Sequence, residues 1–286
     1  MRYSYIIFYH RVLPQHLKKF TTQIKILKKL SKIVDISEIE NLKHNSLIIT
    51  FDDGFYDNYV FAYPILKKFN IPATIFISTA KITDNPPRKN LFDWWSGKVS
   101  FKELIDNSEE FLSWEEIKIM NKSGLINIQA HSHNHYSHFT SYYFIKEPQR
   151  KRKALNIKWD NEKLYKIESF LKNFEYIPED MRFENHIERE KRITPEFIKP
   201  KELIKKYLGY YPEHFCWPWG EYDNFSLEIG KKHGYKYFYT TEKGLICDKI
   251  NFEKIPRISS SFNYFKFLKR NMIYPNNLFA KILRLC

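Results

Sequence analysis

The run Leu47-Ile48-Ile49-Thr50-Phe51-Asp52-Asp53-Gly54 joins an apolar, largely β-branched segment to two acidic residues and a glycine. This composition is typical of a buried strand that ends in polar chemistry. Gly54 allows the chain to turn sharply behind the acidic pair. Neighbouring side chains of an extended chain point in opposite directions, so we expect Asp52 and Asp53 to face different partners.

Strand-like and helical segments alternate on both sides of this run. We predict strands at 4–9, 47–51, 71–78, 126–130, about 215, 235–240 and 254–258, and helices at 20–30, 58–69, 114–122, 201–208 and 225–233. Ser113 and Glu116 mark the start of one helix as a capping box, and Gly124 marks its end. Such alternation predicts a parallel sheet wrapped by helices.

Two segments depart from this alternation. Residues 139–200 are rich in Lys, Arg, Glu and Tyr, and the apolar positions from Leu164 to Phe174 predict one amphipathic helix. We interpret 139–200 as a charged, largely helical insertion in a single domain that spans residues 1–286. The tail at about 262–286 alternates aromatic and basic residues, so it either packs on the domain or lies on a membrane surface.

Composition limits the class of protein. Hydrophobic residues make up 43% of the 286 residues and aromatic residues 17%, which excludes a disordered chain. The three cysteines are odd in number and form no CxxC pair, so neither a disulfide framework nor a cysteine-bound zinc is predicted, and a reducing compartment fits best. No run approaches the roughly 18 apolar residues of a membrane-spanning helix.

The chain is strongly basic, with 47 Lys and Arg against 33 Asp and Glu and a net charge of +14. Such a surface attracts an anionic partner, which can be nucleic acid, an acidic glycan or a membrane face. A composition that reflects codon usage is the competing interpretation. Only charge supports nucleic-acid binding, so we expect no nucleic-acid partner.

A second predicted strand, 126–130, ends in the run His131-Ser132-His133-Asn134-His135. The carboxyl ends of parallel strands meet at one edge of a sheet, which brings these histidines toward the acidic pair. Two imidazoles and one carboxylate form a divalent-metal site with open positions, which predicts His131, His135 and Asp53 as ligands. Asp52 then becomes the general base of a hydrolase, unless it only caps the helix that follows.

The chain resembles the polysaccharide deacetylases of the NodB homology domain, which form carbohydrate esterase family 4. The resemblance is carried by Tyr9-His10-Arg11-Val12, Thr50-Phe51-Asp52-Asp53-Gly54, the stretch from Pro64-Ile65-Leu66-Lys67-Lys68 to Pro72-Ala73-Thr74, Leu112-Ser113-Trp114-Glu115, His131-Ser132-His133-Asn134-His135, Trp217-Pro218-Trp219-Gly220 and Ile255-Pro256-Arg257-Ile258. It implies a distorted (β/α) barrel and an enzyme that removes an acetyl group from a sugar. An N-acetyl group is favoured over an O-acetyl group as the one removed. The resemblance also implies Asp52 as general base and Zn²⁺, or Co²⁺, Ni²⁺ or Mn²⁺, on Asp53, His131 and His135.

Two features depart from the family pattern. The arginine that usually opens the third motif is replaced by Cys216, and we expect Arg257 to supply its positive charge. In the same motif the Trp219 amide is a candidate oxyanion donor. The rings of Trp217 and Trp219 either stack on sugar or belong to the core.

The late histidine that often serves as the family's general acid is also missing, because none follows His233. His10, at the end of the first predicted strand, is our candidate acid. A hydrogen-bonded core histidine is the alternative role for that residue.

We therefore expect a metal-dependent deacetylase whose partner is an acetylated glycan, namely a surface polysaccharide, a lipopolysaccharide or a precursor of either. The N-terminal run shows no signal-peptide cleavage site, so we expect a mature chain from Met1 and a cytoplasmic protein. It would act free or peripherally on the inner membrane face, with an anionic membrane or a lipid-linked glycan as further partner. The alternative is a catalytically inactive sugar-binding scaffold on the same fold.

Overall fold

The computed structural model describes residues 3–106, 110–140, 167–247 and 249–283. Its largest element is an eight-stranded sheet in which all pairings are parallel. Its strands are β1 (Tyr5–Tyr9), β2 (Lys32–Ile33), β3 (Ser46–Phe51), β4 (Ala73–Ile77), β5 (Ile126–Ala130), β10 (His214–Cys216), β11 (Tyr237–Tyr239) and β12 (Ile258–Ser259). The predicted alternation of strands and helices is therefore confirmed.

The sheet curls into a distorted barrel. The strand order is β11-β10-β5-β4-β3-β1-β12, with β2 added beside β3. A bridge between Tyr239 and Ile255 links β11 to the segment just before β12, so the two ends of the strand order meet. The barrel expected from the family resemblance is confirmed.

Alternate side chains of the strands fill two separate cores. Tyr5, Ile7 and Tyr9 of β1 belong to the large core under the helices. Ile6 of β1 lies in a smaller core inside the barrel, together with Ile48 of β3. This alternation is the period-2 pattern of strands that are covered on both faces, and it fixes which residues at a strand end point inward.

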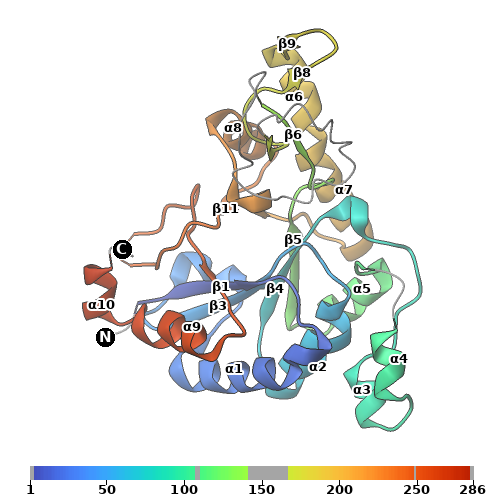
Figure 1. The fold of residues 1–286 in the computed structure, drawn as a ribbon, viewed down its shortest axis with the longest axis vertical. Helices are drawn as coiled ribbons and strands as arrows, with labels where there is room; N and C mark the ends of the chain where they lie inside the picture. The colour runs from blue at the N-terminus through green and yellow to red at the C-terminus, as the bar shows by residue number, and fades with distance from the viewer. Residues whose placement is uncertain (1–2, 107–109, 141–166, 248, 284–286) are drawn as a thin grey trace, which may run out of the picture.

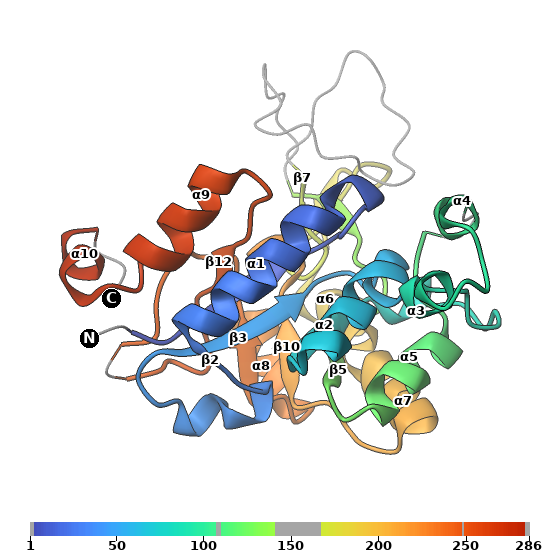
Figure 2. The ribbon, with the colours of Figure 1, turned by 90° about the horizontal axis from the view of Figure 1, so that it is seen from below.

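Helices wrap the outside of the sheet (Figures 1 and 2). The longer ones are α1 (Leu17–Leu30), α2 (Tyr63–Phe69), α5 (Trp114–Lys122), α7 (Pro195–Leu208) and α8 (Asn224–Lys232), and the short ones after β4 are α3 (Leu91–Trp95) and α4 (Phe101–Ile105). A π-helical segment, Asn58–Ala62, leads into α2 and places Pro64 in the first turn of α2. A proline is tolerated there because its missing backbone N–H is not needed for a hydrogen bond within α2. The capping box at Ser113 is present as predicted.

The insertion is less helical than predicted. Residues 141–166 lie outside the described residues, and 167–174 contain the strand β7 (Ile167–Ser169), which pairs with β6 (Ser137–Phe139). The helix predicted across 164–174 is thus wrong where it is described. Side chains of the domain satisfy the backbone there instead: Ser169 N donates to Glu221 and Asn173 N to Asp223, both over 2.9 Å.

Beyond β7 the insertion contains a small hairpin and one helix. The hairpin is β8 (Tyr176–Ile177) with β9 (Arg182–Phe183), and the helix α6 (His186–Ile193) leads into α7, which continues past the predicted boundary at 200. Figure 1 shows this unit projecting from one end of the barrel.

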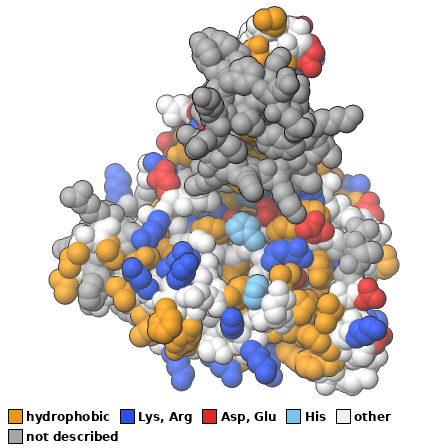
Figure 3. Space-filling view, viewed as in Figure 1, with side chains coloured by type: hydrophobic (Ala, Val, Ile, Leu, Met, Phe, Trp, Pro, Cys, Tyr) orange, Lys and Arg blue, Asp and Glu red, His pale blue; other side chains and the backbone are white. Residues whose placement is uncertain are grey.

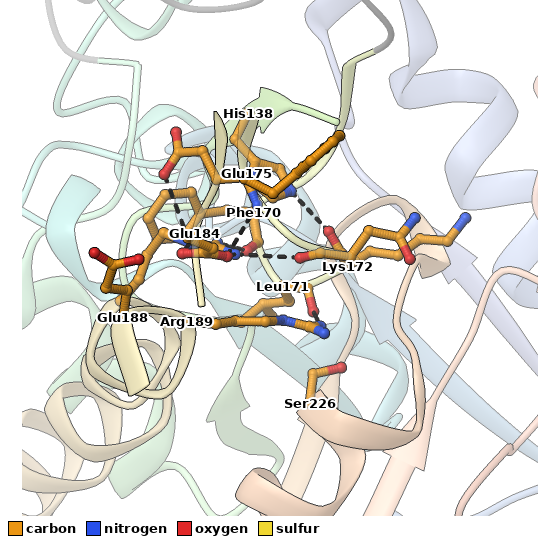
Figure 4. Close-up of polar contacts among 12 residues, drawn as sticks. His138, Phe170, Leu171, Lys172, Glu175, Glu184, Glu188, Arg189 and Ser226 are labelled. Atoms are coloured by element: carbon orange, nitrogen blue, oxygen red, sulfur yellow. Dashed lines mark hydrogen bonds and ion pairs between the residues drawn. The ribbon is translucent and has the colours of Figure 1, made fainter. Parts of the chain in front are cut away.

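Ion pairs hold the insertion in place, and Figure 4 shows the polar contacts around Glu184 and Arg189. Arg189 of α6 lies 2.6 Å from Asp223, whose side chain caps α8. Arg192 of the same helix contacts Glu184, and both side chains are largely buried. The first pair joins the insertion to the domain, and the second pair fixes α6 against another part of the insertion.

The tail forms a C-terminal arm, residues 264–283, made of α9 (Tyr264–Leu268), the π-helical segment Lys269–Ile273 and α10 (Asn277–Ile282). Phe267, Tyr274 and Ala280 are buried, so the arm packs on the domain. Within the described part of the chain, no helix combines the length and the apolar character needed to cross a bilayer.

The cysteines differ from one another. Cys216 is free and buried, whereas Cys247 is disulfide-bonded, which the odd cysteine count did not predict.

Candidate metal centre and catalytic residues

Asp53, His131 and His135 meet at the carboxyl edge of the sheet. Nε2 of His131 lies 3.3 Å and Nε2 of His135 lies 3.2 Å from Oδ1 of Asp53. Asp53 lies two positions after the end of β3, and His131 directly follows β5. The three donor atoms lie within 4.8 Å of one another, so the structure brings together the ligand set suggested by the sequence.

The loop that carries the two histidines is not helical. Ser132 and His135 adopt left-handed φ angles of 65° and 58°. Oγ of Ser132 accepts a hydrogen bond from N of His135 over 3.1 Å. This tight turn, rather than a helical i,i+4 spacing, places both imidazoles on the same side, with ring centroids 4.8 Å apart.

The chemistry of the three donors fits a divalent transition metal. Oδ1 of Asp53 is buried and receives no well-directed hydrogen bond. Nδ1 of His131 lies 2.7 Å from the carbonyl oxygen of Cys216, which holds the ring proton on Nδ1 and leaves the Nε2 lone pair facing Asp53. A buried acceptor that meets two imidazole nitrogens is a donor set that suits a divalent cation.

The imidazoles also shape the charge of Asp53. Burial raises the pKa of this carboxyl, but the close approach of His131 and His135 outweighs burial and holds the pKa well below its usual value. Burial lowers the pKa of His135. Burial also lowers the pKa of His131, but Cys216 and the two aspartates outweigh burial and raise it well above its usual value, so metal binding must displace a proton from this ring.

Asp52 points into the barrel and binds Arg257. Its Oδ1 and Oδ2 accept hydrogen bonds from Nη1 and Nη2 of Arg257 over 2.7 and 2.9 Å. Burial raises the pKa of Asp52, and the guanidinium more than offsets this, so the pKa is lowered. The segment at Asn58 is capped by no side chain, so the alternative role of Asp52 as a helix cap is wrong.

Arg257 is fully buried, and its side chain contacts residues of several strands. Its Nε donates to the carbonyl oxygen of Thr240 over 2.9 Å, and its Nη2 lies 2.9 Å from Sγ of Cys216. The guanidinium also lies over the ring of Phe8, 4.5 Å from the centroid. The small thiol of Cys216 leaves room for an arginine that arrives from the segment before β12, so the positive charge expected of Arg257 is present next to Asp52.

A second group of possible ligand atoms, on Asp52, His131 and Cys216, lies within the same 4.8 Å limit. Arg257 already contacts both the carboxylate and the sulfur of this group. A guanidinium at this position repels a further cation, so we assign the metal to the Asp53 group.

The two tryptophans of the third motif have different environments. Trp217 is fully buried and stacks on Tyr222 and Phe238, with centroids 4.8 and 5.4 Å away. Stacking of Trp217 on sugar is therefore wrong, because the ring belongs to the core. Trp219 is half-buried, has a φ of 56°, and its ring meets that of His135 at 4.3 Å.

His10 lies at the end of β1 and is exposed. Its carbonyl oxygen accepts a hydrogen bond from Asn58, and its charge is among the minor factors that lower the pKa of Asp52. Because the side chain is exposed, the alternative of a core histidine is wrong.

Two positioning residues were not found from the sequence. Glu196, in the first turn of α7, is buried and accepts hydrogen bonds from N of His133 and N of Asn134 over 2.9 and 2.8 Å. Asp57 accepts from Nε of Arg11 over 2.7 Å. The sequence offered a hint of the Arg11–Asp57 contact, because Arg11 belongs to one quoted motif and Asp57 closely follows another. It offered no hint of Glu196, which lies in the insertion.

Comparison with known proteins places these features in a family. Residues 40–238 match the sequence profile described as polysaccharide deacetylase. Over 217 residues, covering 76% of this chain, the sequence is 27% identical to poly-β-1,6-N-acetyl-D-glucosamine N-deacetylase of Escherichia coli strain K12. The match spans only 28% of that relative's length.

Further relatives extend the likeness. A protein of the same name from Staphylococcus aureus strain MRSA252 is 28% identical over 258 residues, which are 87% of this chain and 69% of that protein. The structure of a de-N-acetylase from Aggregatibacter actinomycetemcomitans superposes with a TM-score of 0.68 at 18% identity, covering 94% of this chain and 99% of that one. The structural likeness concerns the fold.

Proposed function

Because the chain belongs to the polysaccharide deacetylase family, we propose that it hydrolyses the N-acetyl groups of a β-1,6-linked N-acetylglucosamine polysaccharide. The substrate class follows the names of the Escherichia coli and Staphylococcus aureus relatives. The observation that carries the proposal is the convergence of Asp53, His131 and His135 within 4.8 Å. Asp52, whose carboxylate accepts a hydrogen bond from Arg257, is the residue next to Asp53 in the chain.

Asp53, His131 and His135 would hold the metal, for which we propose Zn²⁺, with Co²⁺, Ni²⁺ or Mn²⁺ as alternatives of similar ligand chemistry. Such an ion, when bound, acidifies water and polarises the acetyl carbonyl. The Nδ1 contact of His131 with Cys216 orients its ring for that purpose. Glu196 fixes the backbone of the same loop from α7.

Asp52 acts as the general base that takes a proton from the attacking water. The two hydrogen bonds from Arg257 keep this carboxylate ionised and fix its orientation. We assign the backbone N–H of Trp219 as the donor to the carbonyl oxygen of the acetyl group. The contact between the Trp219 ring and His135 places this turn beside the proposed metal ligands. His10 at the exposed rim supplies the proton for the leaving amine, so that the products are acetate and a free amino sugar.

The test is acetate release from β-1,6-linked N-acetylglucosamine oligomers by the full chain, before and after chelation and after adding back Zn²⁺. We expect release that is lost with the metal and restored with it. O-acetylated oligomers, tested in parallel, separate amide from ester hydrolysis. Tight metal binding without acetate release from any acetylated sugar would instead assign the chain as a sugar-binding scaffold.

A further inference from the structure

The C-terminal arm exposes apolar side chains that the rest of the protein does not cover. Single exposed apolar residues are common on proteins, but a cluster in one short segment marks an interaction surface. The exposed side chains are Phe265 (81%), Ile282 (67%), Leu278 (66%), Tyr264 (57%), Met272 (44%), Leu283 (40%) and Ile273 (38%). The arm therefore has two apolar sides, of which only one contacts the domain.

The charges on this segment all have one sign. Residues 257–286 contain no Asp or Glu. Lys266 and Lys269 of the arm are exposed, and among the described residues neither forms an ion pair. Arg270 instead anchors the arm, because its guanidinium donates to the carbonyl oxygens of Ser259 and Ser260.

The arm lies at one edge of the molecule. In Figures 1 and 2 helices α9 and α10 lie side by side there, away from the insertion. Figure 3 shows hydrophobic and basic side chains interspersed over this edge. The edge is thus open to a large, flat partner.

We propose that the C-terminal arm docks the protein on the surface of a membrane that carries anionic lipid headgroups. The exposed aromatic and aliphatic side chains enter the boundary between headgroups and acyl chains, as in interfacial amphipathic helices. The lysines beside them face lipid phosphates, whose negative surface potential attracts cations. This inference is independent of the proposed function.

Charge favours this partner over two others. A second copy would bring an arm with the same cations against the first, which is repulsive. A deacetylated amino-sugar polymer is itself cationic and is repelled for the same reason. An anionic membrane satisfies both the apolar and the basic side chains.

Binding of the full chain to sedimented vesicles tests the proposal. One set of vesicles contains phosphatidylcholine alone, and the other also contains phosphatidylglycerol. We expect binding to the second set only, with weakening at high salt. Absence of binding to the anionic vesicles would overturn the proposal.

Matched variants locate the binding surface. Phe265→Asp should reduce the bound fraction about tenfold or more, because it places a charge where an apolar side chain enters the interface. Ile187→Asp is the control, since Ile187 is 79% exposed on α6, outside the arm. The double change Lys266→Glu and Lys269→Glu should act similarly, with Lys122→Glu and Lys206→Glu as exposed controls on α5 and α7.

Two further readouts keep the result unambiguous. Circular dichroism and acetate release from soluble oligomers should be unchanged in the arm variants, so that a loss of vesicle binding reports on the surface alone. Equal losses in arm and control variants would contradict the proposal. So would a dimer of the wild-type chain that Phe265→Asp dissociates, which would assign the arm to self-association.

Discussion

Two groups of buried charges in this protein differ in what they leave unpaired. The strand-end cluster consists of Asp52, Asp53, His131, His135 and Arg257, and the insertion cluster consists of Glu184, Arg189, Arg192 and Asp223. In the insertion cluster each carboxylate faces an arginine. In the strand-end cluster Arg257 pairs with Asp52, while Oδ1 of Asp53 meets two imidazoles instead of an arginine.

The difference separates a structural from a functional set of charges. A buried carboxylate paired with a guanidinium is complete and fixes two elements against each other. A buried carboxylate that faces two imidazole nitrogens, both of them possible metal ligands, is incomplete and invites a ligand. The strand-end cluster combines both arrangements on adjacent residues, which gives one aspartate for catalysis and one for the metal.

Replacing Asp52 should produce the largest effect and would test the catalytic half of this comparison. We expect Asp52→Asn to lower the rate of acetate release by about 10²–10⁴-fold, the usual contribution of a general base. Metal content should stay at the wild-type level, because Asp53 and the histidines are intact. Asp180→Asn, an exposed change in the insertion, is the control. Activity within twofold of wild type for Asp52→Asn would remove Asp52 from the mechanism.

Arg257→Met and Arg192→Met compare the two clusters directly. Each leaves a buried carboxylate without its cation, so each should cost about 3–5 kcal/mol in the free energy of unfolding. Chemical denaturation measures this cost. Only Arg257→Met should also abolish acetate release under conditions where both variants remain folded. Equal activity of the two variants would mean that the Arg257–Asp52 pair is merely structural.

Acidification should weaken the fold through His138, which lies beside the insertion cluster. Burial lowers the pKa of His138 to about 4, with the charge of Arg192 as a further cause. The unfolded chain binds this proton near pH 6.5 and the folded chain only near pH 4, so stability falls as pH decreases through this window. We expect a loss of about 2 kcal/mol between pH 7 and pH 5. His138→Gln should flatten the profile, and an unchanged slope would exclude His138 as its source.

Removing Glu196 should have the smallest effect of the four. Glu196→Ala leaves all ligands in place but releases the backbone of the His133–Asn134 turn. We expect metal affinity to fall about tenfold, at the lower end for residues that support ligands. Competition with a chromogenic chelator measures this affinity. Glu202→Ala, an exposed change on the same helix, should leave it unaltered.

Much of the fold could be predicted because its strands are short apolar runs with clear ends. The run to Phe51 and the run to Ala130 both stop at polar residues, and parallel pairing brings their ends to one edge. The ligand residues could be selected on that basis alone. Their roles were then supported by the family motifs.

Other features depend on contacts that no local pattern encodes. The burial of Trp217 follows from its stacking on Tyr222 and Phe238, and a motif cannot distinguish that from an exposed ring. The helix predicted up to Phe174 fails because Glu221 and Asp223 supply backbone partners from a distant segment. Glu196 acts through a loop more than sixty positions earlier in the sequence.

The position of Arg257 late in the chain has a consequence for biosynthesis. A nascent polypeptide that has emerged only as far as residue 240 already holds both aspartates and both histidines of the strand-end cluster, but not the guanidinium that secures the first aspartate. A chain that ends before Arg257 would leave the Asp52 carboxylate without its counter-charge.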